Sequence, residues 1–231
     1  MPPNPIIVSI EGNIGAGKST FLKSLEKHVY DSRMKNNNIN FTISFVTEPV
    51  KDWMGLTTKD GISMLQNFYD NPTKNAFAFQ ILALSAICKD HHEMIRIHKE
   101  NRVQGVMITE RSVTSTSRVF TEMLHQKGYI SEVEKISYVQ MYNEVAQDIS
   151  PSLIIYIQSN PDVCLFRVTN RARDGENNIS MQYLTELHEA YEHWIQTTHI
   201  PVIRLTISPD ATTFTDQDYA KILEEISAKI E

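Results

Sequence analysis

Short, strongly apolar segments alternate along the chain with longer segments in which apolar residues recur every three or four positions. Short runs rich in Val, Ile and Phe are typical of buried strands, whereas the longer recurrence indicates helices with one apolar face. Strands are predicted over residues 6–10, 41–46, 105–109, 153–157 and 202–207. Helices are predicted over residues 18–30, 74–100, 113–126, 131–147, 161–173, 180–197 and 216–230.

This order of elements predicts an α/β fold. Strands that alternate with helices pair in parallel, and the helices between them cover both faces of the sheet. We therefore expect a five-stranded parallel sheet flanked by helices, in one domain spanning residues 1–231, because this length supports a single sizeable core. The helix-rich stretch 50–100 is longer than a crossover requires, and we expect it to wall a ligand pocket at the carboxyl ends of the strands.

Composition and charge narrow the possible partners. The chain is 41% hydrophobic and 22% charged, which is typical of globular proteins. A formal net charge of −6 argues against a broad basic surface for nucleic-acid polymers, so a small anionic ligand fits better. The sequence shows no long apolar stretch and no secretory signal pattern, so we expect no membrane partner and an intracellular, cytoplasmic location. Cys88 and Cys164 stand alone in apolar surroundings and are expected to be reduced, buried thiols.

The first predicted strand leads directly into a phosphate-binding loop of the pattern Gly-x4-Gly-Lys-Ser. The residues concerned are Gly12, Asn13, Ile14, Gly15, Ala16, Gly17, Lys18, Ser19 and Thr20. The glycines let successive backbone N–H groups point at phosphate oxygens, and the helix that follows presents its positive dipole end. Lys18 is expected to reach the β- and γ-phosphates, and the Ser19 hydroxyl to ligate Mg²⁺. The loop therefore predicts a nucleoside triphosphate with Mg²⁺.

Charged residues follow the next two predicted strands. Glu110 and Arg111 come after the third strand, where a carboxylate can order Mg²⁺ and an arginine can clamp transferring oxygens. Glu48 comes after the second strand and could accept a proton from a substrate hydroxyl, the base that a kinase of alcohols requires. The alternatives are a solvated loop pair for Glu110 and Arg111, and an acid at the start of a helix for Glu48.

Positive charge gathers before the turn Asp174-Gly175, from Arg167, Arg171 and Arg173. Arginines next to a glycine-containing turn suit a lid that closes on phosphates, and the lid is expected to cover residues 167–179. The alternative is a charged helix end that faces water.

Five motifs in this order resemble the deoxynucleoside kinase family, of the deoxycytidine, deoxyguanosine and thymidine kinase 2 type. The resemblance runs from about residue 6 to about residue 207. The motifs are the phosphate loop, Thr47-Glu-Pro-Val-Lys-Asp-Trp53, Tyr69 with Gln80, Glu110-Arg-Ser112, and Arg167-Val-Thr-Asn-Arg-Ala-Arg173 with Glu176. Apart from the loop, each motif is weak alone, and their shared order carries the resemblance.

The resemblance implies ATP-dependent phosphorylation of the 5′-hydroxyl of a deoxyribonucleoside in nucleotide salvage, with ATP and Mg²⁺ as cofactors. It implies that Glu48 is the base on that hydroxyl, and that Arg111 holds Glu48 and the developing phosphate. It also implies a P-loop kinase fold with the arginine lid over ATP, and a homodimer packed through the helices around 74–100 and 131–147.

The resemblance also assigns the acceptor site. Gln80 would pair with the base edge, and Tyr69 and Glu176 would hold the sugar 3′-hydroxyl. The side chains implied to line the base pocket are Trp53, Phe79 and Phe120. Because Trp53 follows the Glu-Pro turn directly, we expect it at the pocket mouth.

Three departures from the family pattern bear on base preference. Members selective for deoxycytidine carry an Arg seven residues after the Gln and an Asp six residues after the Glu of Glu-Arg-Ser, whereas this chain has Ile87 and Thr116 there. These smaller or apolar residues leave room for a 5-methyl group, so the pocket is expected to prefer thymidine and other pyrimidines or to be broad. Gly175 replaces a lid acid, which leaves the preference among bases open.

Two other classes share the phosphate loop. A GTPase switch would also fit the Asp-x-x-Gly string at Asp52, but that string does not directly follow a strand and the sequence has no Asn-Lys-x-Asp motif. A nucleoside-monophosphate kinase of the thymidylate type is the nearer alternative, although such enzymes usually have Asp-Arg, not Glu-Arg-Ser, after the third strand. A deoxynucleoside kinase is therefore the preferred interpretation.

Overall fold

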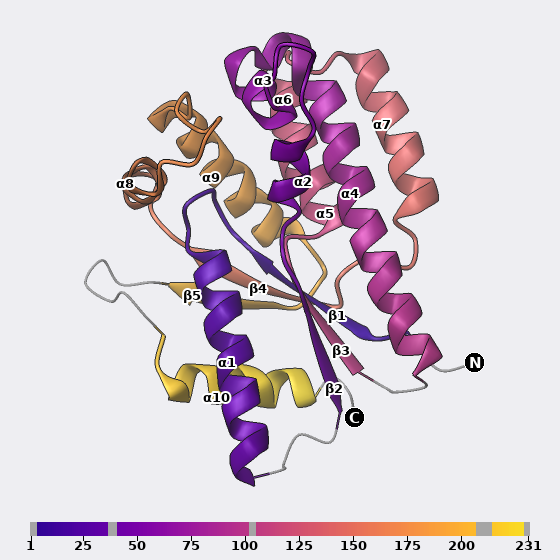
Figure 1. Ribbon diagram of the computed structural model, residues 1–231, viewed down its shortest axis with the longest axis vertical. Helices are drawn as coiled ribbons and strands as arrows, with labels where there is room; N and C mark the ends of the chain where they lie inside the picture. The colour runs from indigo at the N-terminus through magenta and orange to yellow at the C-terminus, as the bar shows by residue number, and fades with distance from the viewer. Residues whose placement is uncertain (1–3, 37–40, 102–104, 207–213, 229–231) are drawn as a thin grey trace.

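The strands of the described residues form one parallel sheet in the order β2-β3-β1-β4-β5 (Figure 1). They are β1 (Ile6–Glu11), β2 (Thr42–Val46), β3 (Gly105–Glu110), β4 (Leu153–Gln158) and β5 (Val202–Thr206). The computed structural model describes residues 4–36, 41–101, 105–206 and 214–228. The predicted α/β class and all five predicted strands are confirmed.

Helices connect the strands and cover both faces of the sheet (Figure 1). They are α1 (Lys18–Asn36), α2 (Val50–Gly55), α3 (Met64–Asp70), α4 (Pro72–Glu100), α5 (Val113–Ser115), the π-helix η1 (Thr116–Thr121), α6 (Glu122–Gln126), α7 (Glu132–Val145), α8 (Pro161–Arg171), α9 (Met181–Thr197) and α10 (Asp216–Ser227). All strands point the same way, so their carboxyl ends lie along one edge, where ligands bind in folds of this type.

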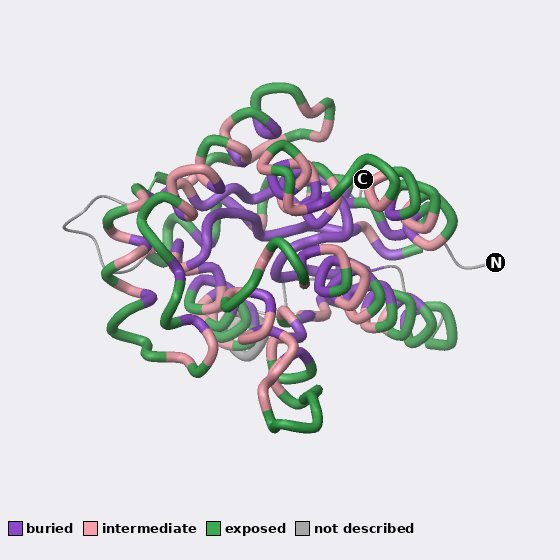
Figure 2. The backbone as a smooth tube through the Cα atoms, turned by 90° about the horizontal axis from the view of Figure 1, so that it is seen from above, coloured by how far each residue is buried: buried purple, intermediate pink, exposed green. Residues whose placement is uncertain are grey.

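The core lies on both sides of the sheet because neighbouring residues of a strand point to opposite faces. Ile7 of β1 packs in one apolar cluster with Leu84 of α4 and Tyr138 of α7. Val8, the next residue, packs in the other cluster with Phe21 of α1. The inner strands β3, β1 and β4 are therefore buried at the centre of the molecule, while the edge strands β2 and β5 are partly exposed and the outer turns of the helices are exposed (Figure 2). Burial on both faces explains why the inner strands are apolar runs in the sequence.

The predicted helix 113–126 is the main correction to the sequence-based elements, because the chain forms α5, η1 and α6 there. The hydroxyl of Thr121 donates to the carbonyl of Thr116 at 2.8 Å, and the hydroxyl of Thr116 donates to the carbonyl of Val113 at 2.7 Å. Such side-chain bonds compete with the regular helical ladder, and π-helical turns concentrate at functional sites.

Smaller differences concern the element ends. Helix α1 continues to Asn36, six residues beyond its predicted end, whereas α7 and α8 each end two residues early. Residue 207 of the last predicted strand and residues 229–230 of the last predicted helix lie outside the described residues.

Candidate active site

A cavity of about 950 Å³ opens at the carboxyl edge of the sheet, between the phosphate loop, the helices of 50–100 and the segment after α8. It brings together nearly all of the residues singled out from the sequence. Those that line it are Ile14, Gly15, Gly17, Lys18, Ser19, Thr20, Glu48, Trp53, Tyr69, Phe79, Gln80, Ile87, Glu110, Arg111, Thr116, Phe120, Arg167, Arg171, Arg173 and Glu176. The predicted residues outside its lining are Gly12, Asn13 and Ala16.

The phosphate loop adopts a conformation that only glycine accommodates at Gly15. Its φ is +79°, and a β-carbon there would lie 2.4 Å from the carbonyl oxygen of Cys164 in α8. The side chain of Asn13 does not line the cavity because it is engaged elsewhere. Its amide donates to the carbonyl of Leu184 in α9 at 2.8 Å, and its side-chain oxygen accepts from the N–H of Ile14. The loop is thus fixed against both α8 and α9.

Lys18 is held inside this loop. Its side chain is buried, and the ammonium donates to the carbonyl oxygen of Asn13 at 2.9 Å. Burial, and then the nearby positive charge of Arg111, lower the pKa of Lys18 to about 8. A polyphosphate in the loop would supply the negative charge that favours the protonated form.

Ser19 and Glu110 meet at the start of α1. The Ser19 hydroxyl donates to Oε1 of Glu110 at 2.7 Å, so one hydroxyl and one carboxylate oxygen already converge beside the phosphate loop. Magnesium prefers such oxygen ligands and is usually held by one or two protein groups plus substrate phosphates. Among the described residues, no group of three or more His, Cys, Asp or Glu could hold a metal ion.

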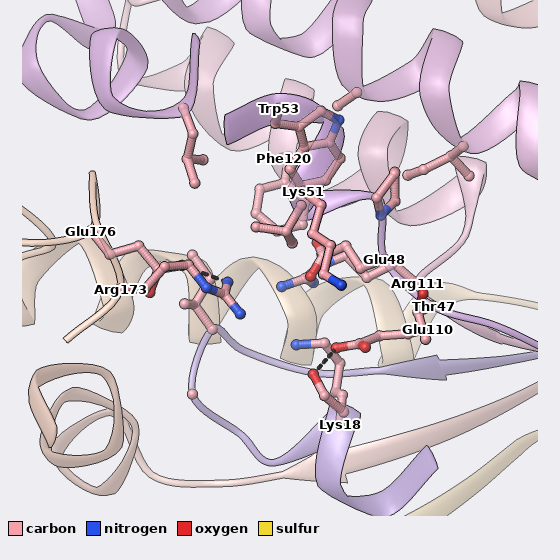
Figure 3. Close-up of a pocket in the computed structure, with 18 of the residues that line it drawn as sticks. Lys18, Thr47, Glu48, Lys51, Trp53, Glu110, Arg111, Phe120, Arg173 and Glu176 are labelled. Carbon is pink, nitrogen blue, oxygen red and sulfur yellow. Dashed lines mark hydrogen bonds and ion pairs between the residues drawn. The ribbon is translucent and has the colours of Figure 1, made fainter. Parts of the chain in front are cut away.

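Glu48 and Arg111 form a largely buried ion pair in the cavity (Figure 3). The Nε of Arg111 donates to Oε1 of Glu48 at 2.6 Å. Burial alone would raise the pKa of Glu48, but the positive charges of Arg111 and Lys18 hold it below the ordinary value. Glu48 is therefore ionised at neutral pH and able to accept a proton, while Arg111 restricts its orientation.

Aromatic residues and one amide enclose the upper part of the cavity. Phe79 is stacked on Phe68 with a centroid separation of 4.8 Å, and Trp53 meets Phe79 edge-on at 5.5 Å. Oε1 of Gln80 and Nε1 of Trp53 are buried without a hydrogen-bond partner. Buried polar atoms are normally paired, so these two atoms mark where a polar ligand edge would fit. Trp53 was expected at the mouth; it is instead 5% exposed, because α2 turns it inward against α4.

Ile87 and Thr116 both line the cavity and offer it no charge. The Thr116 hydroxyl is already engaged, because it donates to the carbonyl of Val113 and accepts from the hydroxyl of Tyr138 at 2.9 Å. Ile87 is buried on the same face of α4 as Gln80. These two positions therefore place no charge beside Gln80 in the cavity.

The expected lid residues are tied to one another and to the phosphate loop. Arg167 donates to the carbonyl of Ala16 at 3.2 Å, whereas Arg171 and Arg173 both pair with Glu176, at 2.5 and 2.9 Å. Glu176, implied to bind the sugar, is thus engaged with two arginines (Figure 3 shows Arg173 beside it).

Gly175 links the same segment to α3. Its φ is +84°, and a β-carbon there would lie 3.2 Å from the backbone nitrogen of Gln66. The glycine that departs from the family pattern therefore lets the lid segment pack closely on the start of α3.

Several residues of the site were missed in the sequence. Phe68 and Ala83 line the cavity, and both could have been found from the sequence. Phe68 directly precedes Tyr69, and Ala83 lies about one helical turn after Gln80. Tyr183 also lines it, with a buried hydroxyl that lacks a partner and a ring edge-on to Tyr69 at 6.0 Å. No local pattern indicated Tyr183.

Two further missed residues, Glu11 and Tyr191, are buried beside Arg111. Glu11 stands directly before the phosphate loop and could have been noticed as a charge at the end of an apolar strand. Tyr191 lies on α9, and only the packing of that helix brings it there.

Comparison with known proteins decides the family. The family model for deoxynucleoside kinases matches residues 8–231. The chain belongs to the deoxynucleoside kinase family. A probable deoxycytidine kinase of Fowlpox virus is 34% identical over 194 residues, which cover 81% of this chain and 71% of that protein. A mitochondrial deoxyguanosine kinase of Xenopus laevis is 30% identical over 88% of this chain and 82% of that protein. The deoxycytidine kinase of Homo sapiens is 28% identical over 95% and 88%.

The resemblance drawn from the motifs is thus confirmed, and this chain is a deoxynucleoside kinase enzyme with a nucleotide phosphate donor. The two alternative classes are not favoured, because the match extends over nearly the whole chain. None of the helices described for this deoxynucleoside kinase has the length and apolarity that crossing a membrane requires.

Proposed function

We propose that this deoxynucleoside kinase transfers the γ-phosphoryl group of ATP to the 5′-hydroxyl of pyrimidine deoxynucleosides, and that it accepts thymidine at least as well as deoxycytidine. The observation that carries the proposal is the ionised Glu48, paired with Arg111 in a cavity that runs from the phosphate loop to Gln80. The phosphate loop, Glu48 and Gln80 follow one another along the cavity in the order in which the donor phosphates, the reacting 5′-hydroxyl and the nucleobase would lie.

The reaction follows from these positions. The Glu48 carboxylate takes the proton of the 5′-hydroxyl, the 5′-oxygen forms a bond to the γ-phosphorus, and the bond from that phosphorus to the bridging oxygen breaks to release ADP. Arg111 and Lys18 are the buried cations that would stabilise the charge on the transferring oxygens. Transfer needs no covalent enzyme intermediate.

Magnesium would be held by Ser19 and Glu110, whose oxygens already converge at the start of α1. When bound, the ion would neutralise charge on the donor phosphates. Glu110 is then a ligand of the ion, whereas Glu48 is the base.

Pyrimidine preference rests on Gln80, Ile87 and Thr116. A Gln amide has one donor group and one acceptor, so it can pair with the edge of thymine or of cytosine by flipping. Ile87 is apolar and the Thr116 hydroxyl is committed elsewhere, so neither residue fixes one amide orientation or repels a 5-methyl group. The relatives are named for deoxycytidine and deoxyguanosine, so the proposal for thymidine depends on these pocket residues of this chain.

A panel of the four deoxynucleosides, with thymidine monophosphate as a fifth acceptor, tests this function. We expect transfer to the pyrimidine nucleosides, with weak purine activity at most, and no transfer to the monophosphate. A kcat/KM for thymidine more than about tenfold below that for deoxycytidine or a purine would contradict the pocket interpretation. Such a ratio means that transition-state binding favours the other nucleoside by about 1.4 kcal/mol. Transfer only to the monophosphate would contradict the acceptor assignment.

The lid and the assembly are proposed on separate grounds. Residues 167–179 would close over the donor by exchanging the pairs of Arg171 and Arg173 with Glu176 for phosphate contacts, which would free Glu176 to join Tyr69 at the sugar.

A homodimer through α4 and α7 is supported by apolar side chains left on the surface of α7: Val133 is 74% and Ile136 61% exposed.

A further inference from the structure

Arg111 has a second set of partners besides Glu48. Its Nη1 donates to the hydroxyl of Tyr191 at 2.5 Å and to the carbonyl of Gly12 at 3.1 Å. The guanidinium also lies 4.7 Å from the centre of the Phe120 ring. The backbone of Arg111 has a φ of +66°, an uncommon conformation for a residue with a side chain, so the surroundings determine where this side chain goes.

The hydroxyl of Tyr191 both accepts a hydrogen bond and donates one. It has a single proton, and because its oxygen accepts from Arg111, that proton is free to be donated to Oε2 of Glu11, 3.2 Å away. The other oxygen of Glu11 accepts from the hydroxyl of Ser112 at 2.7 Å. Two successive hydrogen bonds therefore lead from Arg111 through Tyr191 to Glu11, and we call this chain of hydrogen bonds the relay.

Glu11 is fully buried at the end of β1, directly before the phosphate loop. Burial raises the pKa of its carboxyl, against the hydrogen bond from Ser112 and the charge of Arg111. A carboxylate in this position is costly unless its hydrogen-bond partners are in place. One of those partners, Tyr191, is also the side chain that accepts from Arg111.

We propose that Tyr191 and Glu11 are positioning residues for phosphoryl transfer: they fix the outer edge of the Arg111 guanidinium, so that its Nε edge stays on Glu48 and the group faces the transferring phosphate. The inference rests on the proposed function. Arg111 is then held between two carboxylates, Glu48 directly and Glu11 through a phenol. Small displacements of a group that acts on the transition state carry large rate penalties.

A neighbouring tyrosine provides a matched control. Tyr156 of β4 is stacked on Tyr191 with a centroid separation of 5.9 Å and is also buried. Its hydroxyl, however, donates to Glu192 at 2.9 Å, away from Arg111. Tyr156→Phe and Tyr191→Phe each remove one buried hydroxyl from the same aromatic stack, but only the second breaks the relay.

The test compares Tyr191→Phe, Glu11→Gln, their double variant and Tyr156→Phe with the unchanged enzyme. Calorimetry gives the affinity and stoichiometry of nucleoside binding, and kcat is expressed per binding site, so that partial unfolding does not count as lost catalysis. We expect Tyr191→Phe to lower kcat by about ten- to a hundredfold with the KM of both substrates within about threefold, and Tyr156→Phe to stay within about twofold. The double variant should lose little more than the worse single variant.

Several outcomes would overturn the inference. They are a kcat for Tyr191→Phe within about twofold of the unchanged enzyme, an equal loss in Tyr156→Phe, a loss confined to KM, or fully additive losses in the double variant. If Glu11→Gln fails to fold, the two tyrosine variants still decide the matter. An unchanged enzyme that phosphorylates no deoxynucleoside would instead overturn the proposed function and this inference with it.

Discussion

Arg111 and Glu48 are 63 positions apart in the sequence, yet Nε of Arg111 donates to Oε1 of Glu48 at 2.6 Å in the cavity. The two residues follow adjacent parallel strands, β3 and β2, so the fold brings their side chains to one edge. The proposed base is therefore oriented and kept ionised before any substrate binds. The following predictions depend on this arrangement and on the groups around it.

Replacing Glu48 by Gln should separate binding from turnover. The amide oxygen can still accept from Arg111, so the pocket keeps its shape, but the amide cannot take a proton. We expect nucleoside affinity within a few-fold of the unchanged enzyme and a loss in kcat of about 10²- to 10⁴-fold. Calorimetric binding and steady-state kinetics measure the two quantities, and unchanged turnover would transfer the role of base to another group, with Glu110 the first to examine.

Replacing Lys18 by Ala should abolish transfer. Lys18 is buried in the phosphate loop, and its ammonium is the charge expected to bridge the β- and γ-phosphates. We expect kcat/KM to fall by about 10³-fold or more. The control is Lys27→Ala, on the exposed side of the same helix, which should leave kcat/KM unchanged. Near-normal activity of the Lys18 variant would be incompatible with a phosphate-loop kinase.

His91 should make the protein sensitive to mild acid. Burial, and then the charge of His92, lower the pKa of His91 to about 4, against about 6.5 in an unfolded chain. Because the folded-state pKa is depressed, its contribution is fully present above pH 6.5 and is lost as the pH falls toward 4. The loss is on the order of 3 kcal/mol of unfolding free energy.

Urea titrations at pH 7 and pH 5 measure this effect. His91→Leu should lose less stability between the two pH values than the unchanged protein, whereas His92→Leu, at an exposed position, should reduce the loss only by the smaller share that its charge contributes. An identical pH dependence in the His91 variant would show that other groups cause the acid sensitivity.

The proposed dimer predicts a specific response to charge on α7. Val133 and Ile136 are three residues apart and share one exposed face of the helix. Replacing both by Glu should convert a dimer to a monomer in sedimentation equilibrium, because two charges would be buried without partners in each copy. Lys221→Glu on α10, across the sheet, should leave the assembly unchanged (Figure 1). A monomeric unchanged protein would exclude this dimer.

The sequence predicted the fold class and most of the site because both depend on local signals. The inner strands β3, β1 and β4, buried on both faces, had to be apolar runs, and the phosphate loop had to carry glycines and Lys18 at fixed spacings. Glu48, Glu110 and Arg111 could be selected because parallel strands place their carboxyl ends at one edge. The break of the predicted helix 113–126 at η1 was missed, because the hydroxyls of Thr116 and Thr121 compete with the helical ladder only in their folded geometry.

The order of the elements, the phosphate loop and the charged strand ends can be predicted from local sequence patterns. The distant side chains that complete the site depend on how the helices pack. Tyr191 reaches Arg111 because α9 packs over the carboxyl edge, and Trp53 turns inward because α4 offers it Phe79. Those contacts depend on the angle at which whole helices pack, a quantity set by many side chains together, so no spacing in the sequence reports it.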